Sequence, residues 1–294
     1  MFLISQKMKI VIRIIYVIKN WPKVFLVKFG FLNQAKIHFR NGYIFELDAE
    51  NFGIFTGITQ FFRDFPDGKI KDRITSFRYK NKNLIMDFGS AVAASFCRNE
   101  WDKFLTDEAL RKKTILDFGC SIGDTIIDFA LRGTKRVIGF EILPYRYSLA
   151  LKNILLNNMN EFCSAVNIAV AGECGKMSVN KKQKASEHYS GLGDITKKGG
   201  EVLEVSKITL GDIVKNYNIE NGSIIKSDIQ GGEYDVFMNT PNEILKKFSL
   251  IVIRQYYKKD NRAGELKNRF ESIGFKCKHY KPKKWGCGYL VAMG

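Results

Sequence analysis

The strongest chemical signal in the chain is an acidic, glycine-rich turn at residues 117–125, Asp-Phe-Gly-Cys-Ser-Ile-Gly-Asp-Thr, which follows an apolar run. Glycine is expected at positions 119 and 123 because a ligand must approach the backbone closely there, and a side chain would block it. The helix expected next offers unpaired N–H groups and a positive dipole end to a ligand carboxylate. The glycine spacing matches neither the dinucleotide fingerprint nor the phosphate-binding loop, and it suits a nucleoside without a pyrophosphate.

A second acidic residue strengthens this interpretation. Glu141 ends the next apolar run, 24 residues after Asp117, where a carboxylate can accept hydrogen bonds from both ribose hydroxyls. The stretch at 87–89 begins in the same way, but alanine stands at 93 instead of the second glycine, and arginine stands at 111 instead of the acid. Asp117 alone could be a helix cap, and Glu141 alone could be a solvated strand end. Neither explanation accounts for the two acids occurring together at this spacing. The combination predicts a nucleoside site.

The elements that must position these residues follow an α/β pattern from about residue 113 onward. Short apolar runs alternate with helical spacing, which is typical of a parallel sheet with crossover helices. The runs are 114–116, 136–140, 166–170, 223–226 and 250–253. We therefore expect two domains, an N-terminal α+β subdomain at 1–112 and a ligand-binding domain at 113–294.

Two segments differ from this pattern. Alternation around Asn41-Gly42, over residues 37–47, predicts a hairpin in the N-terminal subdomain. Residues 180–200 are rich in lysine and glycine with little apolar content, and they are expected to form a mobile surface loop.

The formal net charge is +17, and most of it lies at the two ends of the chain. Residues 1–40 hold eight basic residues and no acidic one, and residues 254–294 hold eleven and three. Such ends favour a polyanion, although a lysine-rich composition explains them as well. Residues 8–30 are apolar but are interrupted by basic residues, so they are not expected to span a membrane. They either pack as the first helix or contact a membrane interface, and we expect a cytoplasmic protein, with peripheral membrane contact as one option.

The metal-binding residue types give no cluster. The six cysteines form no C-x-x-C pair and are expected to be reduced. The three histidines stand far apart in the sequence, so no structural zinc site is expected.

These motifs together resemble the FkbM-type family of S-adenosylmethionine-dependent methyltransferases. The resemblance implies a class I, Rossmann-like fold, that is, a doubly wound seven-stranded mixed sheet with helices on both faces. It also implies S-adenosyl-L-methionine as cofactor and methyl transfer, commonly to an oxygen of a sugar, glycan or lipid-linked saccharide. The matching blocks are 117–125, Phe140-Glu141 with Pro144 and Tyr145, Asn153 with Asn157, 167–170, 208–213 and the Lys-Ser-Asp-Ile-Gln-Gly-Gly-Glu stretch at 226–233.

The resemblance also implies residue roles. The cofactor's methionine part would be held by the turn, its ribose by Glu141 and its adenine edge by Ala169 or its neighbours. The turn residues concerned are Asp117, Gly119, Cys120, Gly123 and Asp124. On the acceptor side, Asp228 would act as base or metal anchor. Glu233 would assist it and Lys226 would orient its carboxylate, unless these last two form an ordinary ion pair.

The sequence departs from the family pattern at two acceptor-side positions. Gln230 stands where the signature usually has glutamate, and Arg254 stands where the fifth strand usually ends in an acid. Both changes remove acid–base or metal-ligand capacity, and a positive charge disfavours a divalent cation. We therefore expect no metal, and we assign Gln230 and Arg254 to acceptor binding.

Three functional hypotheses follow. The favoured one is an O-methyltransferase whose anionic or phosphate-bearing acceptor is bound by Arg254. The second is a protein that binds the cofactor but has a degenerate acceptor site. The third, a nucleic-acid methyltransferase, is disfavoured because the sequence has no amine-methylation motif of the N-P-P-Y type, no zinc knuckle and no RNA-binding signature.

Overall fold

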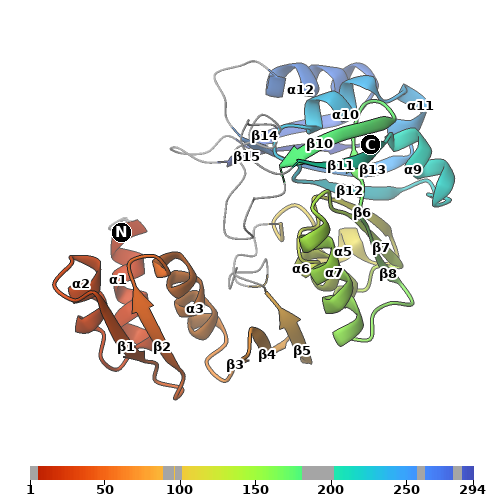
Figure 1. The fold of residues 1–294 in the computed structure, drawn as a ribbon. Coiled ribbons are helices and arrows are strands. Elements are labelled where there is room, and N and C mark those ends of the chain that lie inside the picture. Colours follow the sequence, from red (N-terminus) through yellow and green to blue (C-terminus); the bar gives the residue numbers. More distant parts are fainter. Residues whose placement is uncertain (1–5, 89–95, 97–100, 181–201, 257–261, 281–286) are drawn as a thin grey trace. The chain divides into compact units, whose positions relative to one another are not determined.

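The computed structural model describes residues 6–88, 96, 101–180, 202–256, 262–280 and 287–294. The chain divides into two compact units, Met1–Asn99 and Glu100–Gly294 (Figure 1). The predicted loop at 180–200 lies, from residue 181 onward, outside the described residues.

The described part of the first unit combines helices with two small antiparallel sheets. The predicted hairpin is confirmed, because its two strands pair antiparallel with His38 opposite Ile44, and Gly42 between them has φ 91°. Packed phenylalanines form the core, with ring centroids 5.1 Å apart for Phe39 and Phe62. The elements are α1 (Gln6–Val17), α2 (Pro22–Lys28), β1 (Gln34–His38), β2 (Ile44–Asp48), α3 (Phe52–Asp64), β3 (Lys69–Lys71), β4 (Ile74–Tyr79) and β5 (Lys82–Asp87).

The apolar segment at 8–30 forms α1 and α2, and only part of it is buried. Its inward-facing residues are Ile14, Val17, Ile18, Val24 and Val27, whereas its other large apolar side chains reach the surface. Packing as a first helix is therefore correct for one face of each helix. None of the described helices is both long and apolar enough to cross a membrane.

The second unit is built on a seven-stranded mixed sheet with the order β14-β15-β13-β12-β6-β7-β8. The neighbouring pairs are parallel except for those made by β15, which runs antiparallel to both β13 and β14. The strands are β6 (Thr114–Phe118), β7 (Arg136–Phe140), β8 (Cys163–Val166), β12 (Ser223–Ser227), β13 (Phe248–Tyr256), β14 (Lys276–Tyr280) and β15 (Cys287–Met293). The predicted doubly wound α/β fold is confirmed.

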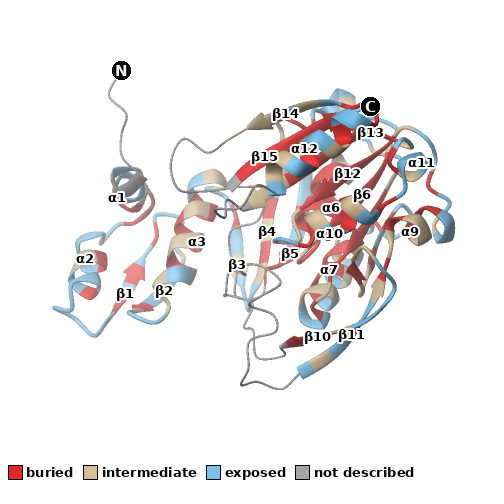
Figure 2. Cartoon of the chain, turned by 90° about the horizontal axis from the view of Figure 1, so that it is seen from above, coloured by how far each residue is buried: buried red, intermediate tan, exposed pale blue. Residues whose placement is uncertain are grey.

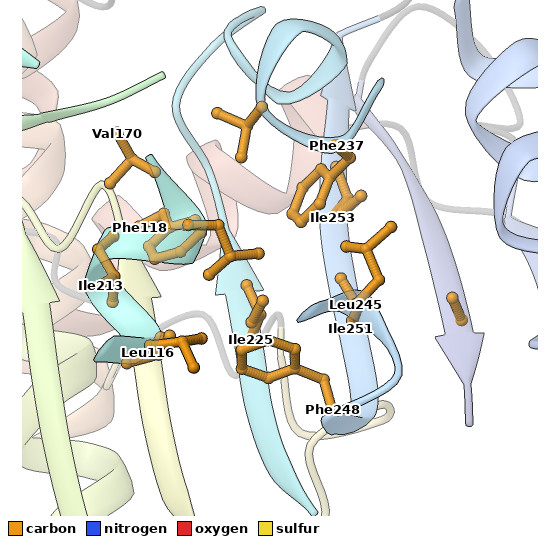
Figure 3. Packing of buried hydrophobic residues seen from close by; sticks show 14 of the residues in the cluster. Leu116, Phe118, Val170, Ile213, Ile225, Phe237, Leu245, Phe248, Ile251 and Ile253 are labelled. Carbon is orange, nitrogen blue, oxygen red and sulfur yellow. The ribbon is translucent and has the colours of Figure 1, made fainter. Parts of the chain in front are cut away.

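Helices cover both faces of this sheet. Alternate side chains of the central strands point to the face covered by α9 (Leu210–Asn216), α10 (Glu233–Asn239) and α12 (Arg262–Ser272), because successive strand residues point to opposite faces. The buried residues on this face include Leu116, Phe118, Ile225, Ile251, Ile253, Ile213 and Phe237 (Figure 3). In Figure 2 these strands are coloured as buried, while the neighbouring helices expose their outer sides.

The opposite face is covered by α6 (Asp124–Leu131), and α7 (Pro144–Leu156) packs against β8. The close approach of α6 depends on Gly139 of β7. A Cβ atom there would lie 2.4 Å from Ile126 Cδ1 and 2.7 Å from Cys120 Sγ. Residues that alternate with the core positions of β6 and β12, among them Asp117 and Lys226, therefore point to the α6 face.

One predicted strand is corrected. The run at 166–170 does not form a single strand, because β8 ends at Val166 and β9 (Ala169–Val170) belongs to a separate sheet. The break lies at Asn167, whose Nδ2 donates to the backbone oxygens of Glu141 and Ile142, at 2.8 and 3.0 Å. That small sheet also contains β10 (Gly175–Asn180) and β11 (Val202–Ile208).

In the structure the boundary between the two units lies after residue 99, whereas the sequence analysis expects it after residue 112. Residues 101–112, which include α5 (Asp107–Leu110), belong with the sheet because Arg132 holds them. This buried guanidinium, which follows α6, lies 3.0 Å from Asp102 and 2.5 Å from Asp107. The remaining described helix of this unit is α11 (Asn242–Leu245).

The strand order places the glycine-rich turn at a topological switch point. From β6 the sheet continues through β7 and β8 on one side and through β12 and β13 on the other. Ligands of open α/β sheets bind beyond the carboxyl ends of the strands at such a point. The turn after β6 leaves the sheet there.

Candidate functional site

The turn that leaves β6 contains three residues in left-handed backbone conformations. Gly119, Ser121 and Gly123 have φ angles of 75°, 51° and 80°. A Cβ atom on Gly119 would lie 2.3 Å from the backbone oxygen of Asp228, and one on Gly123 would lie 3.1 Å from Cα of Ala150. The close approach of the protein's own backbone is therefore a reason for glycine at both positions that does not depend on any ligand.

Glu141 closes this turn from the neighbouring strand. The side chain is buried directly after β7, and its Oε2 accepts a hydrogen bond from the amide of Ser121 at 2.9 Å. Its Oε1 accepts one from the amide of Leu143, also at 2.9 Å. Burial raises the pKa of this carboxyl, and Arg146 and the two amides oppose that effect. Each carboxylate oxygen has a second lone pair, so Glu141 keeps acceptor capacity for a pair of ligand hydroxyls.

Asp117 and Lys226 form a buried ion pair between β6 and β12. The Lys226 ammonium lies 2.6 Å from Asp117 Oδ1 and also donates to the backbone oxygen of Gly119 at 3.0 Å. Thr125 donates its hydroxyl to the second oxygen of Asp117. Asp117 is 0% and Lys226 2% exposed. Protein groups thus engage both oxygens of Asp117, and the ion pair of Lys226 is with Asp117 rather than with Glu233.

The charged state of this pair is set by its surroundings. Burial lowers the pKa of Lys226, but the carboxylates of Asp117 and Asp228 outweigh this effect and leave the pKa above its ordinary value. The ammonium also lies 5.2 Å from the ring centroid of Trp101, a favourable cation–π distance. Lys226 is therefore a permanent cation at the centre of the site.

The acceptor side contains a second, partly exposed ion pair. The amide of Asp228 donates to the backbone oxygen of Phe118 at 2.9 Å, which ties the residue to the end of β6. Its Oδ2 lies 3.3 Å from Arg254 Nη1, and the two side chains are 17% and 19% exposed. Among the described residues, no group of three or more histidine, cysteine, aspartate or glutamate side chains is placed to hold a metal ion. A guanidinium here favours anions over cations.

Glu233 shapes the loop between β12 and α10. Its Oε1 accepts from the amide of Ile229 at 2.8 Å, and its Oε2 accepts from the amide of Gly231 at 2.7 Å. Between these amides Gln230 has φ 55°, and its Oε1 is buried with no hydrogen-bond partner among the described residues. Burial raises the pKa of Glu233 to about 7, and the nearby charge of Asp228 adds to the effect. Glu233 therefore holds the loop that carries Gln230.

Of the three other predicted cofactor residues, Cys120 and Asp124 belong to the same turn, and Ala169 lies in β9 of the small sheet. Cys120 is buried, with its Sγ packed toward Gly139, so only its backbone can reach a ligand. Asp124 is the first residue of α6, and the preceding Gly123 provides no side-chain cap. The positive dipole end of α6 at this turn favours a negatively charged group. Ala169 is buried in β9, where it pairs with Lys207 of β11.

Several residues that build the site were given no role by sequence reasoning. The amide of Ser121 and the hydroxyl of Thr125 lie within the recognised motif, so the signal was present but pointed to the glycines. Asn167 also lies within a matching block, and its side chain holds the tight turn after β8. Trp101 lies outside every motif, and its packing on Lys226 has no signal in the sequence.

Comparisons with known proteins identify the relationship of this chain. A family model described as Methyltransferase FkbM domain matches residues 117–277. No curated protein matches the chain in sequence.

Solved structures resemble the chain at low sequence identity. The methyltransferase FkbM from Methylobacillus flagellatus KT is 16% identical, with a TM-score of 0.43 over 61% of this chain and 43% of that chain. This chain thus spans less than half of that protein. Aeropyrum pernix fibrillarin in complex with natively bound S-adenosyl-L-methionine is 9% identical, with a TM-score of 0.43 over 89% and 94%. An rRNA methylase from Streptococcus thermophilus is 11% identical, with a TM-score of 0.39 over 64% and 90%.

The buried ion pair makes a prediction for stability. Lys226→Met leaves the Asp117 carboxylate buried without its cation, which is expected to lower the free energy of unfolding by about 3–5 kcal/mol. The double variant Asp117→Asn/Lys226→Met is expected to be more stable than Lys226→Met alone. Urea titrations of the three variants measure both effects.

The matched control is the surface ion pair of Lys135 and Glu220. The Lys135 ammonium lies 2.6 Å from Glu220 Oε2, and both side chains are exposed. Lys135→Met should change the free energy of unfolding by no more than about 1 kcal/mol. If Lys226→Met lowers the free energy of unfolding as little as the control does, the buried ion pair does not stabilise the fold as predicted.

Glu233 makes a prediction for pH dependence. The pKa of the Glu233 side chain is about 7 in the folded protein, whereas the ordinary pKa of a glutamate is 4.5. Its contribution to stability is therefore fully present below pH 4.5 and is lost as the pH rises through about 7, a change of about 3 kcal/mol. Glu233→Gln should flatten this part of the profile, measured as the free energy of unfolding at a series of pH values. An unchanged profile would contradict the assignment.

Proposed function

The chain belongs to the FkbM methyltransferase family, and from this premise we propose that it is an S-adenosylmethionine-dependent methyltransferase. The observation that carries the proposal is the contact between the turn after β6 and Glu141 after β7, at the switch point of the sheet. This arrangement provides acceptors for hydroxyl groups and the positive end of a helix at one edge of the sheet.

The residues present fit an adenosyl sulfonium cofactor. Glu141 keeps acceptor capacity for the two ribose hydroxyls, and the uncapped first turn of α6 can bind the methionine carboxylate. When bound, the cofactor supplies an electrophilic methyl group for transfer.

The acceptor side supports an oxygen nucleophile on an anionic molecule. Asp228 is held at the end of β12 by the backbone of β6, and it can receive the proton that an attacking hydroxyl must lose. Arg254 lies beside it and can bind a carboxylate or phosphate of the acceptor. We therefore propose O-methylation of an acidic or phosphate-bearing sugar, glycan or lipid-linked saccharide.

The same ion pair supports a second candidate function. Arg254 already neutralises Asp228, and Gln230 offers no acidic group, so the chain could bind the cofactor without turning it over. The two candidates differ only on the acceptor side. Cofactor affinity is expected in both, and methyl transfer only in the first.

Glu141 makes the prediction for cofactor binding. Glu141→Gln is expected to lower the affinity for S-adenosylhomocysteine by about 10–100-fold, since hydrogen bonds to a charged acceptor contribute roughly 1.5–3 kcal/mol. Isothermal titration calorimetry measures the dissociation constant. The control is Glu243→Gln, an exposed glutamate in the first turn of α11, which should bind like the parent protein. Absence of binding by the parent protein would refute the proposal.

Asp228 and Arg254 make the prediction for transfer. With labelled S-adenosylmethionine and a panel of sugar phosphates, uronic acids and matched neutral sugars, methyl incorporation is expected only into the anionic members. Asp228→Asn should lower kcat about 10²–10⁴-fold. Arg254→Gln should raise KM for the anionic acceptor with a smaller effect on kcat.

A second pair of substitutions distinguishes the two candidates. If the panel stays unlabelled although the cofactor binds, the double variant Gln230→Glu/Arg254→Glu restores the usual family residues at both positions. Activity gained by this variant supports the degenerate site. Equal activity of the parent protein and Asp228→Asn would remove Asp228 as the base.

A further inference from the structure

The first unit carries an unusual surface along α2 and the turns that flank it, which we call the amphipathic tip. It consists of exposed apolar side chains and exposed lysines between residues 19 and 32. The apolar members are Trp21, Leu26, Phe29, Phe31 and Leu32, and the basic members are Lys19, Lys23 and Lys28. Phe29 is 67% and Phe31 75% exposed. A cluster of this kind is rare on a protein surface without a function.

The apolar side chains of the tip are held together by the backbone. Helix α2 buries Val24 and Val27 on its inner face, which leaves Leu26 on the outer face. The chain then turns at Gly30, with φ 77°, and folds back. The amides of Phe31 and Leu32 both donate to the backbone oxygen of Leu26, at 2.8 and 3.1 Å.

Both ends of the tip are fixed. The amide of Phe29 donates to the backbone oxygen of Phe25 at 2.9 Å, and the Trp21 ring lies 5.9 Å from that of Phe25. The exposed rings are therefore presented by a hydrogen-bonded turn. A rigid presentation lowers the entropy lost on binding.

The charge around the tip selects the occupant. Residues 1–40 contain eight basic residues and no acidic one, so two copies of this surface would repel each other and an anionic partner is favoured. Leucine side chains and the rings of Trp21, Phe29 and Phe31 gain from insertion into hydrocarbon, while lysines remain at headgroup level. Nucleic acid would use the lysines and rings, but it offers no apolar phase for Leu26 and Leu32.

We propose that the amphipathic tip docks the protein onto an anionic membrane surface. Phe29, Phe31 and Leu26 insert below the headgroups, Trp21 lies at the interface, and Lys19, Lys23 and Lys28 contact anionic lipids. This docking does not depend on the proposed methyl transfer, and it makes a membrane-bound acceptor accessible if transfer occurs.

The test is flotation of the full chain with vesicles of phosphatidylcholine containing about one third phosphatidylserine, compared with phosphatidylcholine alone. Binding to the anionic vesicles is expected to be at least about tenfold stronger and to weaken as salt is added. Phe29→Ser/Phe31→Ser should reduce binding at least about tenfold through lost insertion. Lys19→Glu/Lys23→Glu should reduce it by a similar factor through lost attraction.

Two matched controls accompany these variants. Lys69→Glu/Lys82→Glu makes the same charge change on exposed lysines of β3 and β5 in the same unit. Leu155→Ser removes an apolar side chain that is 61% exposed on α7. Both should bind vesicles like the parent protein. Unchanged circular dichroism of all variants shows that they are folded, and this readout is independent of cofactor binding.

Three results would overturn the proposal. The first is absence of binding to anionic vesicles. The second is equal binding by the Phe29→Ser/Phe31→Ser variant and the parent protein. The third is retention of transfer RNA or dimer formation that depends on the tip without any vesicle binding, which would assign the surface to nucleic acid or to a second copy.

Discussion

One buried ion pair joins the centre of the sheet to the site. Lys226 of β12 reaches Asp117 of β6 where neither side chain meets water. Removing two charges from water costs several kcal/mol per ion unless both are paired and hydrogen-bonded. Here Thr125 donates a hydrogen bond to the second oxygen of Asp117, and the backbone oxygen of Gly119 accepts one from Lys226. The pair thus fixes two central strands and the first residue of the turn together.

The shape of the turn depends on close backbone packing. Its glycines lie against the backbone after β12 and against α7, so the two strand ends and the helix approach more closely than side chains would permit. Glu141 then connects the turn to β7 through the amide of Ser121. The proposed cofactor side is consequently an arrangement of backbone groups that the protein's own contacts hold in place.

The acceptor side is built differently. Asp228 and Arg254 are partly exposed and face each other across strand ends. Both carboxylate oxygens of Glu233, by contrast, accept hydrogen bonds from the loop that holds Gln230. Sequence reasoning assigned separate roles to these residues. It did not find their partners, because each contact joins residues from different elements. The guanidinium at this edge is the feature on which the proposed binding of an anionic acceptor rests.

The sequence by itself determined the α/β class, the position of the turn and the acid after β7, because strand alternation and left-handed glycine are local properties of the chain. Only the tertiary structure decided that Lys226 pairs with Asp117, 109 residues away, and that the run at 166–170 divides between two sheets. It also decided which side of α2 is buried. Partner choice depends on strand order, register and the faces that other elements cover, and these are set by packing of distant segments.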